Sequence, residues 1–144
     1  MTLDIAEFYQ TFFDEADELL DEMERLLINL DIDAPDSEDL NAIFRAAHSI
    51  KGGAGTFGFT HLQETTHLLE NLLDRARHGE LVLDRPAIDL FLECRDVLAG
   101  QIDAYRAAEE PDQNAYEDMA QRLRTLDEQG SAALANAASA VDKP

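Results

Sequence analysis

The chain has 144 residues, which suits one domain with a single core. It carries 11 lysines and arginines against 31 aspartates and glutamates, and the net charge of −20 disfavours nucleic acids and anionic membranes as partners. The sequence shows neither a signal peptide nor an apolar run of about 18 residues, so we expect no membrane insertion. The single cysteine, Cys94, lies among apolar neighbours. This predicts a buried thiol and a cytoplasmic location.

A first amphipathic helix is predicted over residues 5–30, where apolar residues recur every three or four positions. Asp4 is its expected N-cap, because a short carboxylate accepts hydrogen bonds from the first free amides of a helix. Phe8 and Phe12 belong to the apolar stripe, and we expect both in the core. Pro35 disfavours helical geometry in the residue before it, so the helix should end before that point.

The same periodicity predicts four further helices, over residues 36–54, 60–76, 84–105 and 112–126. Gly79 suits the left-handed position after the third of them, and Asp84 is the expected cap of the fourth. Short links between long amphipathic helices imply antiparallel neighbours. We therefore predict an all-α, up-and-down bundle of five helices, with a four-helix core plus a C-terminal helix.

The composition changes after Gly130, where residues 131–144 are rich in alanine and carry no apolar stripe. Such a segment is typical of a flexible linker. The sequence therefore predicts a domain over residues 1–130 and a linker toward the rest of a longer protein.

His48 lies in the second predicted helix and is followed by three glycines within four positions, in the run FRAAHSIKGGAG. Each glycine costs roughly 1 kcal/mol relative to alanine inside a helix, so three of them require a reason. At about 100° per residue, Gly52 and Gly55 project within roughly 40° of His48. We expect the surface formed by these two and Gly53 to be bare, so that a large partner can approach the imidazole.

The third predicted helix offers a carboxylate for this imidazole. His67 and Glu70 are three residues apart, hence on one face, and an antiparallel hairpin of the two helices would bring Glu70 close to His48. A carboxylate that accepts the proton of one ring nitrogen makes the other a better nucleophile. That nitrogen could attack phosphorus and form a phosphoramidate. Lys51, one turn after His48, is expected to offset the growing negative charge.

Residues 43–59, IFRAAHSIKGGAGTFGF, strongly resemble the signature of histidine phosphotransfer (HPt) domains, and most nearly those at the N-terminus of chemotaxis histidine kinases. Residues 4–16 and 63–73 are similar to the same family, so the resemblance covers about residues 3–127. It implies a bundle of five helices.

The resemblance also implies a function. In this family a separate ATP-binding domain of the kinase, supplying ATP and Mg²⁺ and acting in trans within a dimer, would phosphorylate His48. The phosphoryl group would then pass to aspartates of chemotaxis response regulators. The domain itself would bind no cofactor, and the parent protein would be a histidine kinase associated with membrane receptor arrays. The family's hydrogen-bonding residues correspond to Lys51, His67 and Glu70.

Other readings rest on weaker patterns. His61 and His67 are six residues apart and fall on different helix faces, so no zinc site is expected. The acidic run 31–36 lacks the glycine and glutamate of a calcium loop. The glycines after His48 follow no strand and lack the spacing of a phosphate-binding loop. The alternative function is an acidic helical adaptor that docks a basic partner without chemistry.

Overall fold

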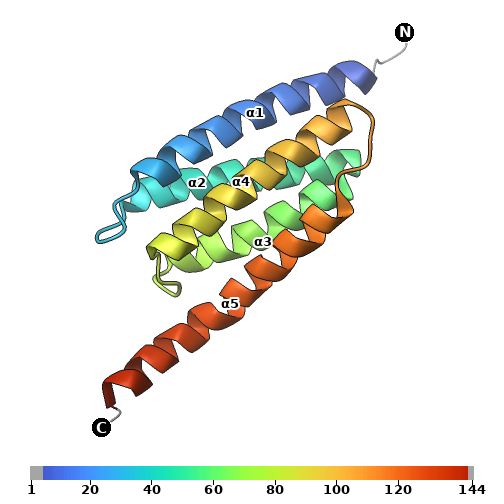
Figure 1. The fold of residues 1–144 in the computed structure, drawn as a ribbon. Helices are drawn as coiled ribbons and strands as arrows, with labels where there is room; N and C mark the ends of the chain where they lie inside the picture. The colour runs from blue at the N-terminus through green and yellow to red at the C-terminus, as the bar shows by residue number, and fades with distance from the viewer. Residues whose placement is uncertain (1–4, 143–144) are drawn as a thin grey trace.

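The computed structural model describes the backbone of residues 5–142 and the side chains up to residue 130. Within that range the chain folds into five helices without any strand (Figure 1). They are α1 (Ile5–Asn29), α2 (Ser37–Phe57), α3 (Thr60–Arg77), α4 (Arg85–Arg106) and α5 (Gln113–Asp142). The predicted all-α class and the number of helices are confirmed.

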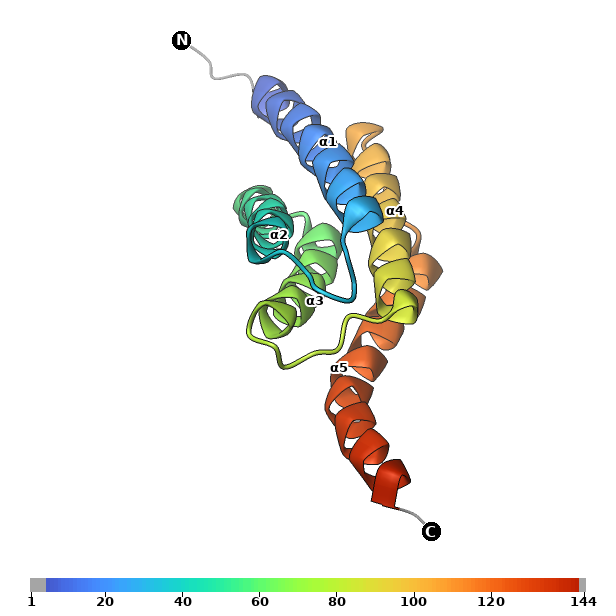
Figure 2. The same cartoon turned by 90° about the vertical axis from the view of Figure 1, so that its left-hand side faces the viewer.

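The first four helices form a four-helix bundle in which each packs on its two neighbours. α1 contacts α2 and α4, and α3 contacts the same two helices from the opposite corner. The α2–α3 contact is the most extensive in the molecule. α5 packs along the outside of α3 and α4 and continues past the end of the bundle (Figures 1 and 2). The predicted core of four helices with an added C-terminal helix is therefore confirmed.

The helix ends follow the capping residues seen in the sequence. The Asp36 carboxylate accepts a hydrogen bond from the Glu38 amide at 2.8 Å. Asp84 accepts one from the Ala87 amide at 3.0 Å, as predicted. Gly79 has the predicted left-handed backbone, with φ of 72°. The expected cap at Asp4 lies outside the described residues.

The core confirms most of the predicted apolar stripes but not the start of the first one, where Ile5 and Phe8 are both exposed. Phe12 and Cys94 are buried, as expected, whereas Phe8 is 49% exposed and is not a core residue. The reason is its place in the first turn of α1, at the end of the bundle (Figure 1). Helical periodicity gives the direction of a side chain but not whether a neighbouring helix extends far enough to cover it.

The C-terminal helix is longer than the sequence predicts. α5 runs through Asp142, so the backbone of residues 131–142 is helical where the composition favours a flexible segment. The last two residues of the predicted linker lie outside the described residues, and the boundary at residue 130 stays a prediction. No helix within residues 5–142 is both long and apolar enough to cross a membrane.

Candidate phosphoryl-transfer site on α2 and α3

A tight link between α2 and α3 places the predicted site residues opposite one another. Gly58 ends α2 with φ of 76°, a left-handed backbone that glycine adopts without the steric cost of a Cβ. Its amide donates to the carbonyls of Ala54 and Gly55, which closes the last turn. Only Phe59 then separates it from α3, and the two helices run back along each other.

The imidazole of His48 faces the carboxylate of Glu70 across this hairpin. His48 Nδ1 lies 3.3 Å from Glu70 Oε1, which confirms the proximity predicted from the spacing. The two side chains differ in burial, since that of His48 is 62% exposed and that of Glu70 only 13%. The carboxylate is thus held beneath an imidazole whose other nitrogen, Nε2, belongs to an exposed ring.

Lys51 binds the other oxygen of the same carboxylate. Its Nζ lies 2.8 Å from Glu70 Oε2, and its side chain is 24% exposed. A half-buried ion pair of this length restrains both partners more than an exposed pair does. Glu70 is therefore fixed between a cation and the imidazole. The sequence predicted a role for Lys51 toward an incoming charge, and in this structure its partner is Glu70.

His67 lies one turn before Glu70 on α3, on the same side of the hairpin. Its Nε2 lies 3.5 Å from the Asn71 side-chain nitrogen, and among the described residues it makes no hydrogen bond or ion pair with the other three predicted site residues. The ring borders a hollow of about 350 Å³ whose other lining residues are Lys51, Gln63 and Glu64. The structure thus brings three of the four residues into contact and places the fourth beside them.

The glycines after His48 have three different environments, and this corrects the expectation of one bare surface. A Cβ added at Gly52 would meet nothing within 4 Å, so this position is open. A Cβ at Gly53 would collide with the ring of Phe12 from α1, and one at Gly55 would lie 2.8 Å from Gln63 Nε2 of α3. Gly53 therefore allows close packing between helices, Gly55 is an exposed residue beside the end of the flexible Gln63 side chain, and Gly52 leaves room for a partner.

Phe44, one turn before His48 on α2, is a neighbour of the imidazole that was not among the predicted site residues. Its ring lies nearly parallel to the imidazole, with an interplanar angle of 14° and 6.0 Å between the ring centroids. Arg77 of α3 also contacts Phe44: its guanidinium carbon lies 3.8 Å from the Phe44 ring centroid. The spacing of four residues between Phe44 and His48 could have indicated this contact, because such residues are neighbours on a helix.

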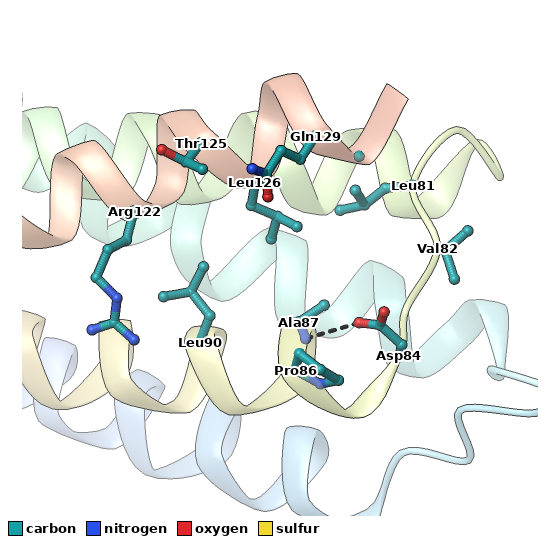
Figure 3. Close-up of a pocket in the computed structure, with 11 residues that line it drawn as sticks. Leu81, Val82, Asp84, Pro86, Ala87, Leu90, Arg122, Thr125, Leu126 and Gln129 are labelled. Atoms are coloured by element: carbon teal, nitrogen blue, oxygen red, sulfur yellow. Dashed lines mark hydrogen bonds between the residues drawn. The ribbon is translucent and has the colours of Figure 1, made fainter. Parts of the chain in front are cut away.

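A larger apolar hollow lies elsewhere, between the start of α4, α5 and the segment that joins α3 to α4 (Figure 3). It has a volume of about 410 Å³, and Val82, Leu90 and Leu126 are among its lining residues. None of its lining residues lies on α2 or contacts Glu70, so it is separate from the candidate site. Across the described part of the chain, no group of three or more His, Cys, Asp or Glu side chains is arranged to hold a metal ion.

Comparison with known proteins identifies relatives of this chain. The Hpt domain family model matches residues 7–126. The chemotaxis protein CheA of Salmonella typhimurium is 63% identical over 126 residues, which are 88% of this chain and 19% of that protein. The chain therefore spans about a fifth of the length of this relative.

Two solved structures share the fold. The CheA phosphotransferase domain from Thermotoga maritima is 34% identical, with a TM-score of 0.65, over 70% of this chain and 96% of that one. The phosphorylated P1 domain of CheA3 in complex with CheY6 from R. sphaeroides is 23% identical, with a TM-score of 0.80, over 88% of this chain and 99% of that one. With the family match over most of its length and an imidazole set against a carboxylate on the neighbouring helix, the chain belongs to the Hpt domain family.

Proposed function

We propose that this domain carries a phosphoryl group on Nε2 of His48. The observation that carries the proposal is the contact of His48 Nδ1 with Glu70 at 3.3 Å on a side chain that is 62% exposed. A proton held on Nδ1 by the carboxylate leaves the lone pair on Nε2, the nitrogen that a partner can reach. The similarity to CheA phosphotransfer domains supports the same assignment.

The first step is attack of the Nε2 lone pair on the γ-phosphorus of ATP. The new N–P bond forms as the bond between the γ-phosphorus and the bridging oxygen breaks, and ADP leaves with that electron pair. The imidazolium that results keeps its proton on Nδ1, where the Glu70 carboxylate stabilises the positive charge. In the second step an aspartate oxygen of an acceptor protein attacks the phosphorus, and the N–P bond breaks.

Lys51 and His67 are the proposed supporting groups. Lys51 keeps Glu70 in place through its ion pair and lies one helical turn from His48. His67 lines the adjoining hollow and can donate a hydrogen bond to a phosphoryl oxygen once a phosphoryl group is present. We expect their loss to slow phosphorylation less than the loss of Glu70, because neither contacts the His48 ring.

The donor and acceptor are proposed to be other proteins. A separate ATP-binding kinase domain, acting in trans within a dimer, would supply ATP and Mg²⁺, and the domain itself would bind neither. Chemotaxis response regulators would accept the phosphoryl group, as the CheA3–CheY6 complex suggests for a domain of similar fold. The parent protein would then be a cytoplasmic histidine kinase associated with receptor arrays.

The direct test is incubation of the domain with a CheA kinase core, Mg²⁺ and radiolabelled ATP. We expect label on the wild type, with the acid lability of a phosphoramidate, and none on His48→Gln. His61→Gln is the matched control, because His61 bonds to Gln113 on α5, away from Glu70, and should retain labelling. Transfer of label to a response regulator would test the second step.

Two results would contradict the proposal. One is an unlabelled wild-type domain in the presence of an active kinase core. The other is label that persists in His48→Gln. An acidic adaptor without chemistry would instead bind its partner equally well with and without His48, and that binding would weaken steeply with salt.

A further inference from the structure

The contact with Glu70 alone does not fix the orientation of the His48 ring. A single contact at Nδ1 leaves the imidazole free to turn about the line from Nδ1 to Glu70 Oε1. Most of the His48 side chain is exposed, so little else there prevents this rotation. The lone pair of Nε2 lies in the ring plane, so turning the plane turns the direction of attack. In-line transfer depends strongly on that direction.

A second contact restrains the ring plane. Phe44, one turn before His48 on α2, lies within 14° of parallel to the imidazole at a centroid separation of 6.0 Å. Offset stacking of aromatic rings is favourable in this range of separations. Contacts at Nδ1 and along the ring face restrain different rotations, and the two together define one orientation.

Phe44 is itself held from α3. The Arg77 guanidinium covers the Phe44 ring at 3.8 Å from its centroid, a cation–π contact. Arg77 donates hydrogen bonds to Asp74 Oδ1 at 2.5 Å and to Asn41 Oδ1 at 3.3 Å. The hydrogen bond from Arg77 lowers the pKa of the Asp74 carboxyl below its usual value, as expected for a carboxylate paired with a guanidinium. Two hydrogen bonds therefore restrain Arg77, and its contact restrains the Phe44 ring in turn.

We propose that Phe44, held in place by Arg77, is a positioning residue that sets the plane of the His48 imidazole and aims Nε2 at the incoming phosphorus. The inference rests on the proposed phosphoryl-carrier function and adds a second restraint to the one supplied by Glu70. Phe44 touches neither donor nor acceptor in this scheme; it acts through the ring of His48.

The test compares Phe44→Leu, which keeps apolar volume but removes the aromatic face, with Phe44→Tyr, which keeps the face. With a CheA kinase core, we expect Phe44→Leu to lower kcat about tenfold, with KM for the domain unchanged, and Phe44→Tyr to restore the wild-type value. Phe57→Leu is the matched control: it is a half-buried phenylalanine of the same helix whose ring contacts are with Tyr9, Phe12 and Phe59. It should leave kcat unchanged.

Two further measurements separate positioning from folding and from the carrier function itself. NMR relaxation of the His48 Cε1–Hε1 bond should show greater ring mobility in Phe44→Leu, with or without any phosphorylation. Arg77→Lys keeps the charge but removes the flat guanidinium that covers Phe44, and it should lower kcat several-fold. This variant tests the same restraint if Phe44→Leu does not fold.

The inference is overturned if the wild type is phosphorylated and Phe44→Leu and Arg77→Lys match its kcat. Unchanged mobility of the His48 ring in Phe44→Leu would overturn it equally. A wild-type domain that takes no label would instead contradict the proposed function, and the NMR result would still decide whether Phe44 orients the ring.

Discussion

The open face around His48 and the packed interior behind it are built from the same helix, α2, and they use the same residue type for opposite purposes. On the open face, Gly52 leaves empty space beside an imidazole that is 62% exposed. In the interior, Gly53 is the next residue, and its missing side chain is what lets the Phe12 ring of α1 approach. One glycine makes room for a partner, and the other for the bundle.

Residues of the same helix should therefore affect different properties, phosphorylation on the open face and stability in the interior. Changes on the open face should alter phosphorylation more than unfolding, because they act on the groups around an imidazole that is 62% exposed. Changes in the interior should alter unfolding, because close-packed cores tolerate neither cavities nor added volume.

The largest effect is expected for Glu70→Gln on the open face. The amide keeps the size of the side chain but cannot stabilise the positive charge that forms on the His48 ring. We expect the phosphorylation rate to fall about 100-fold, within the range that a positioned acid–base group contributes. The thermal midpoint should also fall, because Lys51 loses the partner of its half-buried ion pair. Rates are measured with a CheA kinase core and radiolabelled ATP.

Glu80→Gln is the control for this change, since it removes the same charge from an exposed position in the segment after α3. Its rate should equal that of the wild type. Equal rates for Glu70→Gln and the wild type would show that Glu70 does not activate the imidazole.

A smaller effect, on stability alone, is expected for Gly53→Ala in the interior. The added methyl group collides with the Phe12 ring, and overpacking of this kind costs about 1–3 kcal/mol of unfolding free energy. Gly100→Ala is the control, because a Cβ there meets nothing within 4 Å and should stabilise α4 slightly. Urea unfolding measures both. A Gly53→Ala protein as stable as Gly100→Ala would mean that Phe12 moves aside at no cost.

The sequence was sufficient to predict the bundle and the pairing of His48 with Glu70, because both follow from local periodicity and short links. It could not distinguish Gly53 from Gly52, since the difference depends on which helix covers each one. Helical projection placed Gly55 beside His48 but could not show that the end of the Gln63 side chain of α3 lies next to it. The exposure of Phe8 was missed for the same reason: periodicity describes one helix, whereas burial depends on its neighbours.

The helical backbone beyond residue 130 shows that amino-acid composition alone does not predict secondary structure in this segment. Alanine favours helix as much as it favours a low-complexity linker. Residues 131–142 lack the apolar stripe that packs a helix on the bundle, yet their backbone is helical. The lack of a stripe therefore indicates that a segment does not pack on the core, but not that it is non-helical. The stack of Phe44 on His48 was within reach of the sequence, but an aromatic at helical spacing is ordinarily read as core.

Alkaline pH should affect the interior through Cys94. Burial raises the pKa of this thiol to about 12, whereas the thiol of an unfolded chain ionises near its ordinary pKa of 9.0. Between these values the unfolded state has lost the proton and the folded state has not. Stability therefore falls as pH rises above about 9, by up to about 1.4 kcal/mol per pH unit.

The measurement for Cys94 is the urea midpoint at pH 8 and at pH 10 for the wild type and Cys94→Ala. The variant should start less stable, because it leaves a cavity, but lose less stability between the two pH values. Identical losses would indicate that other groups carry the alkaline dependence. The thiol should also resist alkylation at pH 8 unless the protein is unfolded, because it is fully buried.

The smallest effects are expected at Gly52, the open counterpart of Gly53. Gly52→Ala removes a flexible residue from the interior of α2 without meeting any neighbour, and should raise the unfolding free energy by about 0.5–1 kcal/mol. Gly52→Leu should keep that gain but place a bulky side chain beside His48. Its phosphorylation by the kinase core should show a several-fold higher KM, while its reaction with phosphoramidate, a small donor that needs no docking surface, stays at the wild-type rate. A KM unchanged in Gly52→Leu would show that the partner approaches His48 from another side. The open space at Gly52 would then have no part in docking.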